Sequence, residues 1–342
     1  MCPKDIASFP LKKILLIGLS CLGDNLVLTP AIKLIRDTFK KAEIDIAVGP
    51  AAKEFAENHP WFARHFILEK KSLGQWLRSL QEIRHFRYDL TVDFRNSLLP
   101  FLLRTRYKMT FFWSEFHSDK VFTHESERVL QQLKPFFPLS EEIRLYFPLY
   151  PSEKEKAEKW LKSFDIKRSD ILVTINPGAN FSGKRWAKEK FAAVGRQLVQ
   201  EFEAKILVTG GASEKALAAE ICASIQSRNV INIAGKTTIR ELAALLENCD
   251  LMITNDTGPM HLAVAVDCPV VSIFGPGNPY RYGPLGPRNQ VIHSQISCFP
   301  CQNPAKCHHQ FACMKQVEIE QVIQACRFIL NEGKQLYLFD FE

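Results

Sequence analysis

The sequence has no apolar run long enough to cross a membrane and no segment with the order of a signal peptide. The apolar stretch at residues 14–22 is interrupted by Gly18 and falls short of the roughly 18 uninterrupted residues that a transmembrane helix needs. Residues 1–5 do not show the succession of basic, apolar and small residues of an export signal. We therefore expect a cytoplasmic protein.

The chain also lacks two familiar nucleotide-binding motifs. No Gly-x-Gly-x-x-Gly follows the first strand of either half, which disfavours a Rossmann oxidoreductase. Residues 18–24 have the spacing Gly-x-x-x-x-Gly, but Asp24 and Asn25 stand where a P-loop requires Lys and Ser or Thr. The Gly-Lys-Thr at 235–237 fails for another reason, because Val230 replaces the first glycine. No internal repeat or low-complexity segment is present.

What is present is typical of a two-domain globular enzyme. The chain has 342 residues, 46% of them hydrophobic and 24% charged, which suits two domains of about 150 to 170 residues each. A large chain without an export signal keeps its thiols reduced, so we expect its ten cysteines to form no disulfides. The net charge of +7 favours an anionic partner such as nucleotide phosphate, an acidic membrane or nucleic acid.

Strand and helix patterns alternate along the chain in two series. Alternation of this kind builds parallel sheets with right-handed crossovers. We predict an α/β protein with two Rossmann-like α/β/α domains, residues 1–150 and 151–320, whose parallel sheets face a central cleft. The last helix and tail, residues 321–342, are a candidate to pack back on the first domain. Strands are expected at 14–17, 44–48, 90–94, 171–175, 205–209, 230–233, 251–254 and 270–274, and helices at 26–39, 153–164, 191–202, 214–225, 239–247, 261–266 and 319–330.

Three loops of the second series follow strands and therefore share one sheet edge. Residues 176–186 join a small-residue loop to Lys184 and Arg185, and such a loop suits a diphosphate. The alternative is a solvated loop with a packed tryptophan beneath it. In the loops after the next two strands, Glu214 could bind ribose hydroxyls, and the backbone around Thr237 could read a base edge.

Residues 255–261 form the segment that most strongly predicts a ligand site. They read Asn-Asp-Thr-Gly-Pro-Met-His, with a strand ending before them and a helix starting near Pro259. A helix start offers backbone N–H groups and partial positive charge to an anion, and Gly258 permits close approach. Alternatively, Thr257 is only an N-cap and His261 a core residue.

In the first series, Asp24 is presented by a tight turn after the first strand. This position favours either a catalytic base or an N-cap of the next helix. Two further features stay open. Cys298, Cys301, Cys307 and Cys313, with histidines between them, could hold a structural zinc, but reduced thiols are the preferred interpretation. Basic and aromatic residues over 84–113 could contact anionic lipid or form an ordinary solvated face.

Together these motifs resemble glycosyltransferase family 9, the bacterial lipopolysaccharide heptosyltransferases. The resemblance covers residues 12–326 and rests on 13–17 with 23–24, on 176–179 with 184–186, on 255–262, on 274–276 and on the cysteines of 298–314. It implies a GT-B fold and an inverting, metal-independent transfer of heptose from ADP-heptose to the inner core of lipopolysaccharide. The donor and the lipid A-linked acceptor are then the partners, the enzyme works at the cytoplasmic face of the inner membrane, and neither a cofactor nor nucleic acid is needed.

The resemblance also assigns roles to individual residues. Asp24 matches the general base, Lys184 the lysine that contacts the donor, and Asp256 the acidic residue near the heptose. The helix start, Thr257, Gly258, Pro259, Met260 and His261, matches the phosphate-binding segment, and Glu214 and Thr237 the ribose and adenine contacts. We expect a monomer that associates with the membrane only peripherally. The alternatives are an epimerase-like enzyme or another sugar transferase on the same fold, and a nucleotide- or glycan-binding protein without catalysis.

Overall fold

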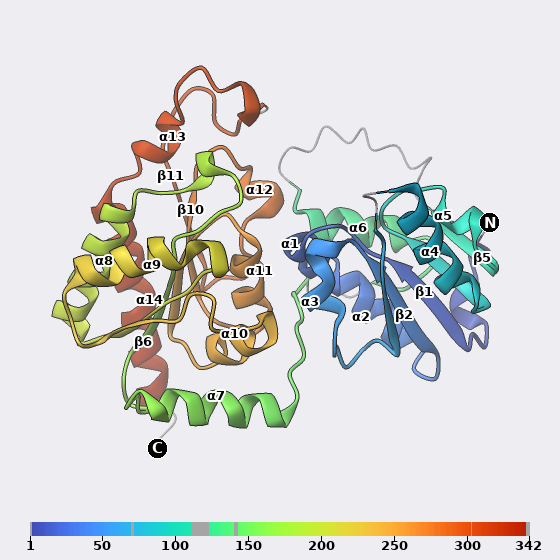
Figure 1. Cartoon of the computed structure of the whole chain (residues 1–342), viewed down its shortest axis with the longest axis horizontal. Helices are drawn as coiled ribbons and strands as arrows, with labels where there is room; N and C mark the ends of the chain where they lie inside the picture. Colours follow the sequence, from blue (N-terminus) through green and yellow to red (C-terminus); the bar gives the residue numbers. More distant parts are fainter. Residues whose placement is uncertain (1, 70–71, 111–122, 140–142, 302, 340–342) are drawn as a thin grey trace. The chain divides into compact units, whose positions relative to one another are not determined.

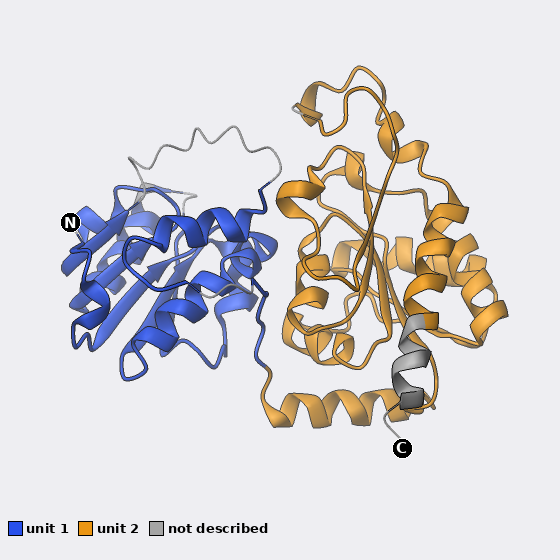
Figure 2. Ribbon diagram, turned by 180° about the vertical axis from the view of Figure 1, so that it is seen from behind, with its two compact units in different colours: residues 1–148 blue, residues 149–342 orange. Residues whose placement is uncertain are grey.

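The protein consists of two compact units, residues 1–148 and 149–342, which Figure 2 shows in different colours. The computed structural model describes residues 2–69, 72–110, 123–139, 143–301 and 303–339. In that part of the chain no helix is both long and apolar enough to cross a bilayer. Each unit is an α/β layer structure around one parallel sheet.

The first unit contains a five-stranded sheet in the order β3-β2-β1-β4-β5 (Figure 1). All four strand pairs are parallel. The central strand β1 is a continuous apolar run whose last four residues are fully buried, as expected for a strand covered on both faces. The strands are β1 Lys13–Ile17, β2 Glu43–Val48, β3 Arg64–Ile67, β4 Tyr88–Asp93 and β5 Thr105–Thr110, and the helices are α1 Leu22–Val27, α2 Thr29–Thr38, α3 Lys53–Ala56, α4 Leu73–Arg84, α5 Leu99–Leu102 and α6 Glu125–Leu133.

The second unit contains a six-stranded parallel sheet in the order β11-β10-β9-β6-β7-β8. Helices α8, α9 and α14 cover one face and α10 and α11 the other (Figure 1). The strands are β6 Leu172–Asn176, β7 Lys205–Val208, β8 Val230–Asn232, β9 Leu251–Asn255, β10 Val270–Phe274 and β11 Gln290–His293, and the helices are α7 Pro151–Ser163, α8 Lys188–Phe202, α9 Lys215–Ile225, α10 Ile239–Leu246, α11 Gly258–Ala265, α12 Pro279–Tyr282, α13 Ala312–Lys315 and α14 Ile319–Phe339.

Each sheet has one place where the chain reverses the direction in which strands are added. In the first unit it lies between β1 and β4, and in the second between β6 and β9. Open α/β sheets bind ligands beyond the carboxyl ends of the strands at such a switch point, because the following loops diverge there. The loops after β1, β4, β6 and β9 are therefore where a site is expected.

The C-terminal helix α14 belongs to the second unit. Its residues Val322, Ile323 and Cys326 are buried in the core of that unit, and Arg327 donates hydrogen bonds to Glu201 of α8, at 2.9 Å from Nε and 2.5 Å from Nη2. These side chains pack within the second unit, and the expectation that the last helix packs back on the first domain stays a prediction. The buried apolar side chains of α14 cover one face of the six-stranded sheet.

One predicted helix, residues 26–39, is divided in the structure. Pro30 cannot donate a backbone hydrogen bond to the carbonyl of Leu26, and the hydroxyl of Thr29 donates to that carbonyl instead, at 2.6 Å. The chain therefore forms two helices, α1 and α2, that meet at Leu28. The short helix α1 therefore directly follows the turn at the first switch point, and Asp24 lies in its first turn.

Candidate active site

The switch point of the second unit brings a lysine and an aspartate together. Lys184 ends the 3-10 helix Ser182–Lys184 in the loop after β6, and Asp256 follows β9 directly. The Lys184 Nζ lies 2.6 Å from Asp256 Oδ2, and the side chains are 31% and 8% exposed. The buried carboxylate of Asp256 thus holds the ammonium group of Lys184 in place, and part of the lysine side chain faces solvent. Both residues were predicted to contact the donor, and the structure places them in direct contact.

Asn255 connects the two loops that carry this pair, although the sequence assigned no role to its side chain. Its side chain is fully buried. Its amide donates to the carbonyls of Pro177 at 2.8 Å and Gly178 at 3.2 Å, and its Oδ1 accepts from the N–H of Trp186 at 3.1 Å. These three hydrogen bonds fix the loop around Lys184 relative to the end of β9. Asn255 is therefore a positioning residue of the site.

The start of α11 differs in part from the predicted phosphate site. Thr257 occupies the N-cap position but its side chain makes no capping hydrogen bond. Its hydroxyl instead lies 3.2 Å from Asn176 Nδ2, which donates to it. Thr257 is thus the N-cap residue by position, as its alternative interpretation has it, but its side chain does not cap the helix. Gly258 and Pro259 are partly exposed beside it.

The next two residues of α11 face inward. Met260 is 0% exposed and its N–H donates to the carbonyl of Thr257 at 3.1 Å, so in this conformation it packs in the core. This differs from the donor contact predicted for it. Since Pro259 has no N–H, the backbone donors left for an anion at this helix start are those of Thr257 and Gly258. His261 is also buried, at 5% exposed, as its alternative interpretation as a core residue requires.

Glu214 lies against the loop after β6. Its Oε2 accepts from the N–H of Gly211 at 2.8 Å, while a Cβ built on Gly178 would fall 1.7 Å from its Oε1. Only glycine at position 178 lets the carboxylate approach so closely. The predicted ribose ligand is therefore partly buried beside the loop that carries Lys184.

Thr237 lies in the loop before α10 and is partly buried. Its neighbour Thr238 is the N-cap of α10, where the Oγ1 accepts from the N–H of Glu241 at 3.2 Å. That cap fixes the backbone around Thr237 because the helix start is rigid. The predicted contact of Thr237 with the base stays a prediction.

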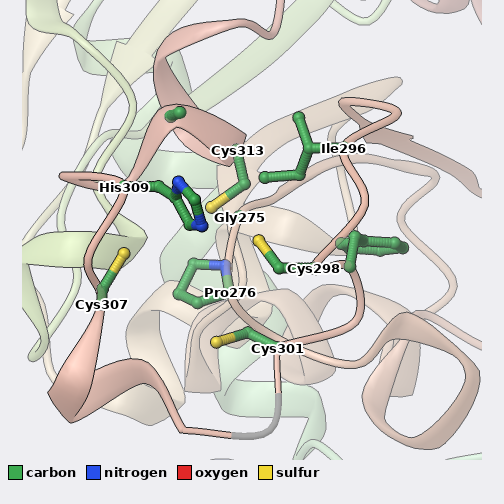
Figure 3. Close-up of a pocket in the computed structure, with 10 residues that line it drawn as sticks. Gly275, Pro276, Ile296, Cys298, Cys301, Cys307, His309 and Cys313 are labelled. Carbon is green, nitrogen blue, oxygen red and sulfur yellow. The ribbon is translucent and has the colours of Figure 1, made fainter.

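The cysteine-rich segment packs against the loop of Lys184. A Cβ on Gly183 would lie 2.4 Å from the ring of Phe311, and Phe181 meets the same ring edge to face at 5.4 Å. Figure 3 shows thiols and the ring of His309 around a small pocket of about 10 Å³, lined by Cys298, Cys301, Cys307, Cys313 and His309 among others. Within the described residues, no three His, Cys, Asp or Glu side chains are grouped so as to hold a metal ion.

All the described cysteines are free thiols, as the sequence predicted. In the pocket, burial raises the pKa of Cys313, and the neighbouring Cys298, Cys307 and Cys301 add to the rise. The ring of Phe311 in this segment packs against Gly183 of the Lys184 loop. The interpretation of the four cysteines as thiols without a structural zinc stays a prediction.

In the first unit, Asp24 is exposed and is the third residue of α1, after the N-cap Cys21. The N-cap interpretation of Asp24 is therefore wrong, and its predicted role as a base stays a prediction. The turn before it depends on Asn25, whose Oδ1 accepts from the N–H of Leu19 at 3.0 Å and whose amide donates to the carbonyls of Leu19 and Cys21. A Cβ on Gly18 would lie 2.4 Å from that Oδ1, which explains the glycine.

Arg95 reaches the same turn from the loop after β4. Its Nη2 donates to Ser20 Oγ at 2.6 Å. Burial lowers the pKa of Arg95, although nearby Asp93 partly opposes this; an arginine remains charged after such a shift. Asp93 itself accepts from the N–H of Arg95 at 2.9 Å and from the N–H and hydroxyl of Ser97 at 2.7 and 2.8 Å. A half-buried cation is thus held at the switch point by Ser20, which lies four residues before Asp24 in the chain.

Comparison with known proteins decides the family. The model of glycosyltransferase family 9 (heptosyltransferase) matches residues 76–311. The chain belongs to this family. As a family 9 glycosyltransferase it is similar to the lipooligosaccharide heptosyltransferase 2 of Campylobacter jejuni, with 30% identity over 325 residues that cover 91% of this chain and 96% of the relative. The lipopolysaccharide heptosyltransferase 2 of Salmonella typhimurium is 28% identical over 310 residues, or 82% and 87% of the two chains.

Solved structures show the same fold for this glycosyltransferase. The ADP-heptose lps heptosyltransferase II of E. coli superimposes with a TM-score of 0.75 at 20% identity, covering 94% of this chain and 99% of that one. A family 9 glycosyltransferase from Veillonella parvula gives a TM-score of 0.80 at 22% identity, covering 95% and 99%. The predicted GT-B fold is thereby confirmed. Both enzyme class and fold agree with a ligand site at the sheet switch points.

Proposed function

We propose that the protein transfers heptose from ADP-heptose to the inner core of lipopolysaccharide, with inversion of the anomeric centre and without a metal ion. The observation that carries the proposal is the contact between Lys184 and Asp256 at the switch point of the second unit, next to the start of α11. Membership of the heptosyltransferase family and the names of the relatives support the sugar and the acceptor.

In the proposed donor site, the diphosphate binds Lys184 and the backbone N–H groups of Thr257 and Gly258. Negative charge develops on the diphosphate as the sugar leaves, and fixed positive groups stabilise it most at that moment. Asp256 then faces the heptose hydroxyls, and Glu214 and Thr237 face the ribose and the adenine.

In the proposed acceptor site, Asp24 removes the proton of the attacking hydroxyl. The acceptor oxygen forms a bond to the anomeric carbon while the bond from that carbon to the diphosphate oxygen breaks, and ADP leaves. Arg95 binds an anionic group of the acceptor, because its guanidinium is held beside the turn of Asp24 by Ser20. Asp24 belongs to the first unit and Lys184 to the second.

The acceptor is lipid-linked, so the proposal includes peripheral association with the cytoplasmic face of the inner membrane. A net charge of +7 favours contact with an anionic lipid surface. The enzyme is proposed to act as a monomer and to bind no nucleic acid.

The test is an assay with ADP-heptose and heptose-deficient lipopolysaccharide, run with and without EDTA. We expect transfer that EDTA does not reduce, and a loss of about 10²- to 10⁴-fold in kcat in Asp24→Asn with ADP affinity retained. Asp37→Asn, an exposed aspartate on α2, is the matched control and should keep full activity.

Each failure of this assay has a distinct meaning. Conversion of ADP-heptose without any acceptor would identify an epimerase-like enzyme instead. Binding of ADP-heptose without transfer to any heptose-deficient acceptor would leave a binding protein. Full activity in Asp24→Asn would remove Asp24 as the base while keeping the transferase function.

A further inference from the structure

The first unit exposes apolar side chains on the short helix α5. Leu98 is 68% exposed, Phe101 58% and Leu102 42%. Among the described residues of this unit, Leu77 is the only other large apolar side chain to be exposed. Three of these four side chains therefore gather within five consecutive residues of the chain. We call Leu98, Phe101 and Leu102, together with Arg104 and Arg106 that follow them, the α5 face.

The exposure of this face does not come from a loosely packed helix. Leu99 and Leu103, which alternate with the exposed residues, are each 7% exposed and pack into the core of the first unit with Leu15 and Ile17 of β1. The buried leucines thus anchor one side of α5 in the core. The exposed residues Leu98, Phe101 and Leu102 form a second apolar side that faces solvent. An apolar side that is not needed for the core is typical of an interaction surface.

The same stretch has a strong bias of charge. Residues 94–114 contain Arg95, Arg104, Arg106 and Lys108 and no acidic residue. Arg106 on the edge strand β5 and Arg104 directly before that strand are both exposed, and the Arg106 guanidinium lies 4.9 Å from the ring centroid of Tyr107. Exposed apolar groups flanked by cations match the boundary between lipid headgroups and acyl chains, where anionic headgroups attract the cations.

The α5 face is also tied to the proposed acceptor site. Leu98 directly follows Ser97, whose N–H and hydroxyl bind the Asp93 carboxylate in the same turn that holds Arg95. A lipid surface against α5 would therefore lie next to Arg95 and the loop of the first switch point. Three apolar side chains are too few for a stable protein interface, which buries on the order of 1,200 Å² or more, but they suit shallow insertion into a bilayer.

We propose that the α5 face docks on an anionic phospholipid bilayer and inserts Leu98, Phe101 and Leu102 between the headgroups. This inference rests on the proposed function, because docking explains how the enzyme reaches a lipid-linked acceptor. The arginines bind phosphate groups of the lipids, and the apolar side chains add an attraction that salt does not screen. Raising the salt concentration should weaken docking only in part.

The test measures co-sedimentation of the full chain with vesicles of phosphatidylcholine alone or mixed with phosphatidylglycerol. The wild type should bind the mixed vesicles and bind phosphatidylcholine far less. Arg104→Gln combined with Arg106→Gln should weaken binding to mixed vesicles by roughly 25-fold, at about fivefold for each cation. Leu98→Ser combined with Phe101→Ser should weaken it by about tenfold or more.

A matched control is Leu77→Ser combined with Phe328→Ser, two side chains that are 43% and 48% exposed and lie outside the α5 face. This variant should bind vesicles as the wild type does. A second readout is transfer to acceptor embedded in vesicles compared with the same saccharide freed of lipid. The α5 variants should lose transfer to the embedded acceptor and keep transfer to the free saccharide.

Vesicle binding by the α5 variants at the wild-type level would overturn the proposal, as would absence of vesicle binding by the wild type. Equal binding to both kinds of vesicle would overturn its electrostatic part. If the wild type binds mixed vesicles through α5 but transfers heptose to neither acceptor, the proposed function fails while the docking surface stands.

Discussion

Replacement of Asn255 by alanine should destabilise the second unit more than a typical surface substitution does. The change removes three buried hydrogen bonds, to Pro177, Gly178 and Trp186. Each hydrogen bond contributes about 1 kcal/mol, and a buried partner left unsatisfied adds about 1 to 3 kcal/mol. Because the loops can relax to admit water, we expect a total loss of about 3 to 4 kcal/mol in the free energy of unfolding.

The measurement must report on the second unit alone, because two units need not unfold in one step. Hydrogen–deuterium exchange of peptides from β9 and β10 meets this condition, since their slowest amides exchange through opening of that sheet. The control is Asn248→Ala, which removes one hydrogen bond to the carbonyl of Ala244 at the exposed end of α10 and should cost less than about 1 kcal/mol. A loss below about 1 kcal/mol in Asn255→Ala would refute the reasoning.

Three further changes test the site and its support. Lys184→Ala should weaken ADP binding about tenfold or more, because the carboxylate of Asp256 then faces the diphosphate without a neighbouring cation. Calorimetry measures this affinity, and an unchanged value would remove Lys184 from the donor site. Gly178→Ala should destabilise the protein because its Cβ overlaps Glu214, and adding Glu214→Ala should restore stability in a double-mutant cycle; additive effects would exclude the contact. Burial raises the pKa of Glu153, but hydrogen bonds from Arg240 and from the N–H of Tyr150 outweigh it and hold the pKa below its usual value. The stability that Glu153 contributes is therefore present at neutral pH and lost as the pH falls through that lowered pKa, so Glu153→Gln should destabilise at pH 7 and have little effect well below about pH 4, in urea titrations at each pH.

The interior strands of both sheets could be predicted from the sequence, whereas three edge strands could not. Strand β1 is apolar over residues 14–17 and strand β9 over 251–253, as expected where both faces of a strand are covered. The missed strands β3, β5 and β11 lie at sheet edges and mix charged or polar residues with apolar ones. An edge strand is often polar because it is partly exposed and must avoid pairing with other chains, so its pattern resembles that of a loop.

The residues of the candidate site also fall into two groups. Some could be predicted from their position after a strand, and others depend on contacts with residues far away in the chain. Lys184 lies in the loop after β6 and Asp256 directly follows β9, so the rule that ligands bind at the carboxyl ends of strands was enough to choose them. Asn255 and Arg95 act through partners that lie 78 and 75 residues away in the chain. Those contacts depend on the order of strands in each sheet, which periodicity does not encode. A motif position also does not say which way a side chain points, and the side chain of Met260 is buried in the core.

The two switch points hold their cations in different ways, and the difference fits two different ligands. Lys184 is already paired with the carboxylate of Asp256, which is 8% exposed. A bound anion must therefore share the ammonium group with Asp256. A doubly charged diphosphate competes for the ammonium group better than a singly charged anion does. Arg95 donates to the neutral hydroxyl of Ser20, while Asp93 uses its oxygens to hold the turn. A weaker anion, such as one carboxylate or phosphate on a saccharide, can therefore bind the guanidinium of Arg95 without displacing a carboxylate from it. This asymmetry is what a transferase needs if it must bind a nucleoside diphosphate firmly and orient a less charged acceptor.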